Sequence, residues 1–143
     1  MKKDEDQIID MQGINEVAEQ NLNTSQDEWK SIIIDNRSGP RYRAEVKEPR
    51  KNCRSGCVPS ALNLPFSEVL DEQNCFKSTE ELMKIFAKAQ IDTEKELIWY
   101  CGSGLTACIP LLAAHILGAK RQKLYDGAWT EYGSYEEPKF STK

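Results

Sequence analysis

The sequence is poor in histidine and has no long apolar run. Its one histidine, His115, stands far from Cys53 and Cys57, the two cysteines that lie closest together. A structural zinc site needs four ligands, so we expect no metal site. The longest apolar stretch, residues 108–117, is interrupted by His115 and falls short of the roughly 20 residues that cross a bilayer. We therefore expect no contact with a membrane.

The sequence also lacks a basic stripe and an apolar signal segment. The 143 residues carry 19 basic and 23 acidic side chains, a net charge of -4, and no basic cluster alternates with aromatic residues. A nucleic-acid partner is therefore not expected. Five of the first six residues are charged and three of them are acidic, unlike a secretory or transit peptide. Five cysteines without a disulfide-like spacing favour a reducing compartment. We expect a cytoplasmic protein and keep a mitochondrial location open.

The length and composition predict one domain with a core of its own. Hydrophobic residues make up 39% of the chain, enough for folding without disulfides. Residues 1–12 are polar and are predicted to be a flexible leader or linker, and residues 13–143 are predicted to be the single domain. Breakers between residues 36 and 60 indicate an irregular segment there.

Strands and helices are predicted to alternate, which favours an α/β fold with a parallel sheet. The β-branched run of residues 32–34 is typical of a strand buried on both faces. Strands are expected at 32–35, 61–64, 97–100 and 123–125, and helices at 13–21, from 78 onward and at 105–117. Either Ser78 or Thr79 could cap the second helix. Pro110 inside the third helix predicts a kink or a later start.

The stretch from Tyr100 to Thr106 carries the strongest chemical signal. Cys101 follows a buried strand, and a glycine-rich loop of Gly102, Ser103 and Gly104 leads through Leu105 and Thr106 into a helix. Sites in open α/β sheets form at the carboxyl ends of strands, where loop N–H groups and a helix N-terminus converge. Such a field favours an anion, so we expect Cys101 to be a thiolate nucleophile. The two glycines are expected to adopt positive φ, and Ser103 and Thr106 could add hydroxyl donors.

One other interpretation of this loop fits the local pattern as well as a nucleophile does, and two further interpretations fit it less well. A buried core cysteine followed by an ordinary turn fits the local pattern as well as a nucleophile does. A phosphate-binding loop is disfavoured because no lysine follows the glycines. A cysteine phosphatase would need an arginine where Ala107 stands. Cys108 is expected to be packed in the helix, and His115 to lie outside the catalytic site.

Four sequence segments follow one another in an order that is typical of a known protein family. Residues 35–50 hold the blocks DNR, RYR and EPR, residues 56–66 read GCVPSALNLPF, residues 101–107 read CGSGLTA, and residues 125–133 read YDGAWTEYG. They resemble the rhodanese family, whose members carry "GHIPGALNLPF" and "YDGSWSEWG". The loop is similar to the "CGSGVTA" loop of 3-mercaptopyruvate-type sulfurtransferases. The resemblance runs from about residue 13 to the end of the chain.

The resemblance implies a roughly five-stranded parallel sheet with helices on both faces and a double-displacement reaction. Cys101 would take sulfane sulfur from a small donor, become a persulfide, and pass the sulfur to cyanide or to a thiol such as thioredoxin or a low-molecular-weight thiol. Arg41 and Arg50 would hold the donor's carboxylate and keto groups, although both could instead be solvated loop charges. The loop lacks a cation, which favours 3-mercaptopyruvate over thiosulfate. No cofactor is expected.

Departures from the family pattern keep a second hypothesis open. Cys57 replaces a histidine, Ser60 a glycine and Ala128 a serine, and the chain resembles only the catalytic C-terminal half of two-domain enzymes. The missing serine and the missing half lead us to expect slow cleavage of the donor. The alternative is a non-catalytic rhodanese-like module that carries sulfur or binds a protein.

Overall fold

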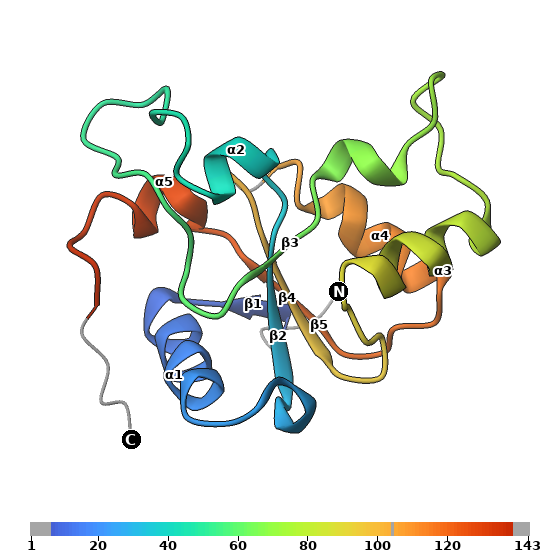
Figure 1. The fold of residues 1–143 in the computed structure, drawn as a ribbon, viewed down its shortest axis with the longest axis horizontal. Helices are drawn as coiled ribbons and strands as arrows, with labels where there is room; N and C mark the ends of the chain where they lie inside the picture. Colours follow the sequence, from blue (N-terminus) through green and yellow to red (C-terminus); the bar gives the residue numbers. More distant parts are fainter. Residues whose placement is uncertain (1–6, 104, 139–143) are drawn as a thin grey trace, which may run out of the picture.

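The core of the fold is a parallel sheet of five strands. The computed structural model describes residues 7–103 and 105–138. The strand order is β1-β5-β4-β2-β3, and every pair of neighbours is parallel (Figure 1). The strands are β1 (Ile8–Ile9), β2 (Ser31–Asp35), β3 (Leu62–Asn63), β4 (Glu96–Tyr100) and β5 (Gln122–Tyr125). The α/β architecture predicted from the sequence is confirmed.

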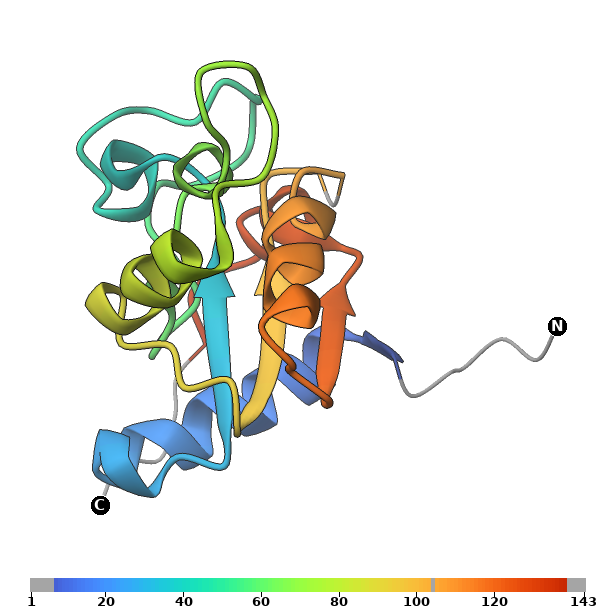
Figure 2. The same ribbon diagram turned by 90° about the vertical axis from the view of Figure 1, so that its right-hand side faces the viewer.

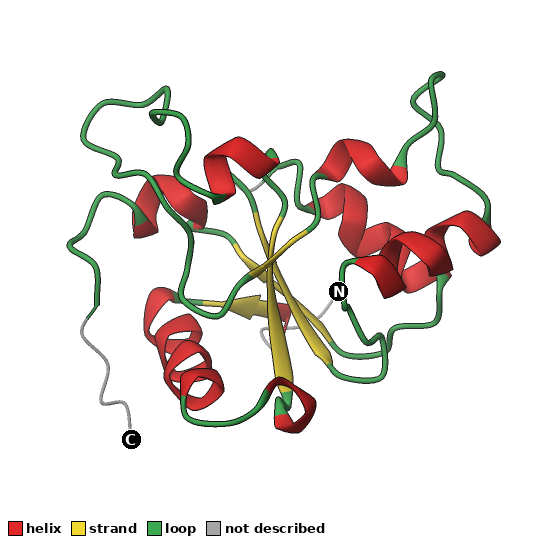
Figure 3. Cartoon of the chain, viewed as in Figure 1, coloured by secondary structure: helices red, strands yellow, loops and turns green. Residues whose placement is uncertain are grey.

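Helices cover both faces of this sheet (Figures 2 and 3). One face packs against α3 (Thr79–Lys88) and α4 (Cys108–Ile116), and the other against α1 (Met11–Leu22) and α5 (Ala128–Tyr132). A fifth helix, α2 (Gly39–Tyr42), follows β2, and 3-10 turns lie at Gln26–Glu28 and Phe66–Val69. Successive strand residues face opposite sides, so Ile32 and Ile34 join the α3/α4 core while Ile33 joins the α1/α5 core. This explains the uninterrupted apolar run in β2.

The first described residues belong to the sheet, which corrects the prediction of a flexible leader up to residue 12. Ile8 and Ile9 pair with Leu124 and Tyr125 of β5, and α1 begins at Met11. The Asp10 carboxylate accepts a hydrogen bond from the Gly13 N–H and caps this helix. A two-residue strand gives no alternating pattern that could be recognised in the sequence. Residues 1–6 lie outside the described part of the chain.

Helix α4 begins at Cys108, three residues later than the expected range of 105–117. Pro110 is the third residue of the helix, in the first turn, where its missing N–H costs no helical hydrogen bond. The later start is therefore the correct alternative for Pro110. Cys108 is exposed, so the expectation that it is packed in the helix is wrong.

The start of α3 is a capping box. The Ser78 hydroxyl accepts a hydrogen bond from the Glu81 N–H at 3.2 Å, and the Glu81 carboxylate accepts one from the Ser78 N–H at 3.1 Å. Ser78 is thus the cap, and Thr79 is the first helical residue. Both ends of the motif satisfy N–H groups that the helix itself leaves without partners.

We expect Ser78→Ala to lower the free energy of unfolding by about 1 kcal/mol, because one N-cap hydrogen bond is lost. Thr79→Ala is the matched control and should change it by less, since the Thr79 hydroxyl makes no cap. Chemical denaturation of both variants measures the difference. Equal losses would show that the capping box does not determine the stability of this helix start.

Candidate active site

Cys101 lies at the carboxyl end of β4, in the middle of the sheet. Strand β4 pairs with β2 on one side and β5 on the other. The Cys101 side chain is in the core, and the residue is only 1% exposed. The loop that follows leads to α4, so the thiol sits at the edge of the sheet where sites form in parallel α/β folds.

Backbone hydrogen bonds from α5 hold the residues on which the loop begins. The Trp129 N–H donates to the Cys101 carbonyl at 2.9 Å, and the Thr130 N–H donates to the Gly102 carbonyl at 3.1 Å. The Thr130 hydroxyl donates a further, short hydrogen bond to the Gly102 carbonyl. Because these donors are fixed in one helical turn, they fix the direction in which the chain leaves β4.

A buried ion pair lies beside Cys101, at the end of β2. Asp35 is the β2 partner of Tyr100, and its carboxylate accepts hydrogen bonds from Arg37 Nη2 and from the Tyr100 hydroxyl, both at 2.6 Å. Burial alone would lower the pKa of Arg37, but the hydrogen bond and the charge of Asp35 outweigh it and raise the pKa. Burial, reinforced by Asp35, raises the pKa of Tyr100 well above its usual value, so the phenol stays a donor. Arg37 is therefore a fixed cation beside Tyr100, the last residue of β4.

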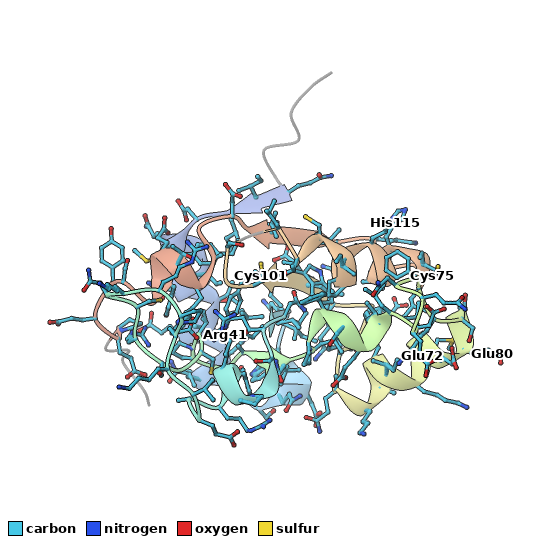
Figure 4. The ribbon with its side chains drawn as sticks, turned by 90° about the horizontal axis from the view of Figure 1, so that it is seen from above. Arg41, Glu72, Cys75, Glu80, Cys101 and His115 are labelled. Carbon is cyan, nitrogen blue, oxygen red and sulfur yellow. The ribbon has the colours of Figure 1, made fainter. Side chains whose placement is uncertain are left out.

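This ion pair continues through Glu48 to Arg41. The Glu48 carboxylate accepts from Arg37 Nη1 at 2.8 Å and from Arg41 Nη2 at 2.6 Å. The Glu48 side chain is 2% exposed and that of Arg41 is 28% exposed. A Cβ atom built on Gly102 would lie 3.1 Å from Arg41 Nη2. The guanidinium of Arg41 therefore lies against the loop that follows Cys101, and Figure 4 labels both residues.

Aromatic stacking connects the same cluster to α5. The guanidinium of Arg37 lies 4.4 Å from the ring centre of Trp129, and that of Arg54 lies 4.8 Å from it. Trp129 also stacks on Tyr132 with ring centres 5.7 Å apart. These cation–π contacts place the helix whose N–H groups hold Cys101 and Gly102.

The predicted loop residues occupy different environments. Gly102 is half-buried and does not adopt the positive φ expected for it. Its lack of a side chain instead leaves room for Arg41. Ser103 and Leu105 are exposed, and Thr106 is half-buried just before α4. Gly104 lies outside the described residues, so its expected positive φ stays a prediction.

The structure brings Arg41, but not Arg50, to the loop. Arg50 is exposed on the segment between α2 and β3, and none of the hydrogen bonds or ion pairs of residues 7–103 and 105–138 involves it. Its role in donor binding remains a prediction. His115 is exposed on α4 and lies well away from Cys101 in Figure 4.

Sequence reasoning did not recognise the residues that organise this site. Asp35 and Arg37 stood in a recognised block, but their burial as an ion pair was not foreseen. Glu48 lies in the segment that was predicted to be irregular, and its contacts depend on tertiary structure. One signal was available, since two opposite charges directly after a fully apolar strand are rarely buried without pairing.

Comparison with known proteins agrees with this geometry. Residues 14–135 match the family model described as "Rhodanese-like domain". The chain belongs to the rhodanese family. The 3-mercaptopyruvate sulfurtransferase of Escherichia coli strain K12 is 46% identical over 102 residues, and the human enzyme of that name is 36% identical over 100. These alignments cover 71% and 70% of the chain.

This rhodanese domain spans about a third of the length of those curated relatives, namely 36% and 34%. Among solved structures, SseA from Escherichia coli superposes with a TM-score of 0.70 and 34% identity. That superposition covers 90% of the domain and 44% of SseA, whose structure is described as the "Rhodanese" fold and catalytic mechanism of 3-mercaptopyruvate sulfotransferases. The five-stranded sheet with helices on both faces is therefore the family fold.

Two further findings concern the described part of the rhodanese domain. None of its helices combines the length and the apolar character needed to cross a bilayer. Residues 7–103 and 105–138 contain no group of three or more histidine, cysteine, aspartate or glutamate side chains that could hold a metal ion.

Cys57, which replaces the family's histidine, is half-buried close to this charge cluster. Burial, with a contribution from the negative charge of Asp35, raises the pKa of its thiol to about 11. The unfolded chain, with an ordinary value near 9, releases this proton first. The contribution of the Cys57 thiol to the free energy of unfolding is therefore fully present below about pH 9 and is lost as the pH rises toward 11.

We expect Cys57 to be alkylated more slowly than the exposed Cys75 at pH 8.5, because the thiolate is the reactive form. The rate of Cys57 alkylation should keep rising with pH until about pH 11. Mass spectrometry of peptides after timed reaction with iodoacetamide measures both rates, and the chain unfolded in urea is the control. A Cys57 rate that levels off near pH 9 in the folded domain would contradict the raised pKa.

Proposed function

We propose that this domain is a sulfurtransferase that moves sulfane sulfur through a Cys101 persulfide. The observation that carries the proposal is the place of Cys101, at the carboxyl end of the central strand β4 with an arginine held against the loop that follows. A cysteine used only for packing would not need a buried ion-pair chain ending at its loop. The names of the relatives support the same chemistry.

The proposed reaction has two displacement steps. The Cys101 thiolate attacks the sulfur of the donor, an S–S bond forms, and the C–S bond of 3-mercaptopyruvate breaks. The electron pair of that bond passes to the enolate of pyruvate, which takes up a proton. An acceptor thiolate then attacks the outer sulfur of the persulfide and leaves with it, and the Cys101 thiolate is regenerated.

We infer that the donor is 3-mercaptopyruvate in preference to thiosulfate. Arg41 supplies a guanidinium edge beside Gly102, and such an edge binds both oxygens of a carboxylate. Arg50 would complete donor binding by moving toward the loop from its exposed position. The loop from Gly102 to Thr106 carries no charged side chain, and Leu105 gives it an apolar side chain that is 79% exposed.

The acceptor is proposed to be a thiol, either a small one or that of a protein such as thioredoxin. Ser103 and Leu105 are exposed on the loop, so an acceptor can reach it from solvent. Persulfide transfer to thiols needs reduced acceptors, which suits the cytoplasm or another reducing compartment. A non-catalytic sulfur carrier is the alternative, and it would accept sulfur without releasing pyruvate.

We expect incubation with 3-mercaptopyruvate to add the mass of one sulfur atom to Cys101, and a reductant to remove it. Cys101→Ser should abolish both the added mass and the release of pyruvate, since the nucleophile is lost. Cys108→Ser is the matched control, because this exposed thiol lies nearby on α4. Intact-protein mass spectrometry measures the added sulfur, and a pyruvate assay measures the release of pyruvate. A Cys101→Ser variant that still gains sulfur at the wild-type rate would disprove the assignment.

We expect Arg41→Ala to weaken use of 3-mercaptopyruvate by about 1.5–3 kcal/mol in kcat/KM, the value of a charge-assisted hydrogen bond. Arg50→Ala should also reduce kcat/KM for 3-mercaptopyruvate, and it should reduce kcat/KM for thiosulfate less. Arg41→Lys should restore only part of the activity, because an ammonium group lacks the planar fork. Steady-state kinetics with both donors test this. Equal losses for the two donors would mean that these arginines do not recognise the carboxylate.

We expect donor cleavage to limit turnover, because Ala128 offers no hydroxyl to assist protonation of the enolate. Ala128 is buried and precedes Trp129, whose N–H holds the Cys101 carbonyl. Its φ of 57° lies in the left-handed region, where Ser and Ala are similarly unfavourable, so Ala128→Ser should be tolerated. The variant should release pyruvate faster in single-turnover experiments, while discharge of a preformed persulfide stays unchanged. A serine variant with no gain would point to another proton donor.

A further inference from the structure

We propose that Glu48 is the positioning residue for donor capture and that it acts by orienting the guanidinium of Arg41 toward the catalytic loop. This inference rests on the proposed function, because it concerns how a carboxylate donor is held. It assigns a role to a buried side chain that does not itself touch the reacting atoms.

Glu48 occupies only one of two edges of the Arg41 guanidinium. Arg41 Nε and Nη2 donate to the two oxygens of Glu48, at 3.2 and 2.6 Å. The Nη1 and Nη2 atoms form the other edge, and they are the atoms nearest to the position of a Cβ on Gly102, at 3.5 and 3.1 Å. Glu48 thus occupies one edge in a bidentate pair, and the edge that it leaves can bind a second carboxylate.

Solvent exposure rises along the ion-pair chain from Asp35 to Arg41. The side chains of Asp35, Arg37 and Glu48 are 0%, 1% and 2% exposed, whereas that of Arg41 is 28% exposed. The two acids and two arginines balance in charge. Only the last member meets solvent, and it does so beside Gly102. A cluster that served stability alone would not need its one accessible cation at the catalytic loop.

Glu48 is itself held in place by a second arginine. Arg37 Nη1 donates to the same oxygen, Oε1, that accepts from Arg41 Nε. Arg37 is in turn fixed by Asp35 through Nε and Nη2 and by stacking on Trp129. An arginine loses less conformational freedom on binding a ligand when its side chain is already ordered. Glu48 therefore makes Arg41 a preorganised receptor for the donor carboxylate.

The test compares Glu48→Gln with Glu45→Gln in the whole chain. Glu45 pairs with Arg43 on the same segment, but both side chains are 54% exposed, so it is a matched control for the loss of a paired acid. Glu48→Gln should raise KM for 3-mercaptopyruvate about 10- to 100-fold with a smaller change in kcat, because the carboxylate is bound alike before and during the reaction. Glu45→Gln should change neither constant. A loss confined to kcat would overturn the inference.

A double-mutant cycle separates positioning from general damage. In the Arg41→Ala background, Glu48→Gln should raise KM no further, because the residue through which it acts is gone. If the two substitutions instead raised KM by independent factors that multiply in the double variant, the inference would be overturned. If Glu48→Gln fails to fold, Glu48→Asp keeps the buried charge but shortens the side chain. It should give a smaller KM increase in the same direction, and an unchanged KM would again contradict positioning.

A spectroscopic measurement keeps this inference distinct from the proposed function. The Arg41 Nε–H should give a slowly exchanging NMR signal in the wild type, assigned by its loss in Arg41→Ala and absent in Glu48→Gln. The Arg37 Nε–H, bound to Asp35, is the internal control. A signal that persists in Glu48→Gln would overturn the positioning role. A wild type that holds this signal but releases no pyruvate from 3-mercaptopyruvate would instead overturn the proposed donor.

Discussion

The buried ion pair between Asp35 and Arg37 is the interaction on which the arrangement of the site depends. Asp35 ends β2 beside Tyr100 of β4, and Arg37 Nη2 contacts both the Asp35 carboxylate and the Gly56 carbonyl. Two charges without solvent are tolerated only when hydrogen bonds satisfy them, and here Tyr100, Glu48 and backbone groups do so. Removal of one partner would leave an uncompensated buried charge at the end of β2.

The same ion pair connects four segments that are distant in the sequence. The Tyr100 hydroxyl, which donates to Asp35, also accepts from the Val58 N–H, and Arg37 stacks on Trp129. The Asp35–Arg37 ion pair therefore supports four parts of the chain together, namely the ends of β2 and β4, the segment before β3, and helix α5. Cys101 takes its place from this support and from the hydrogen bond of Trp129.

Local patterns predicted the fold class and singled out Cys101 as the candidate nucleophile, because both signals lie within a few residues. The apolar runs of β2 and β4 and the CGSG loop are contiguous, and the α3 start was correctly narrowed to two hydroxyls. Short elements were missed, since β1, α2 and α5 hold two to five residues each. The role of Glu48 could not be predicted, because it arises when a segment without regular structure folds back over two arginines. Gly102 shows the same limit, since its small size serves a neighbour that lies 61 positions earlier in the chain.

The burial of Cys101 has a consequence for the size of the molecules that can react there. The residue is 1% exposed, so only a small part of it is open to a group that would deliver sulfur. A persulfide places its outer sulfur about 2 Å beyond the original atom, the length of an S–S bond. In the proposed reaction the sulfur that leaves is thus closer to solvent than the sulfur that attacks. In that reaction, loading would select for a small molecule, whereas unloading would tolerate a bulkier one, such as a cysteine on the surface of another protein.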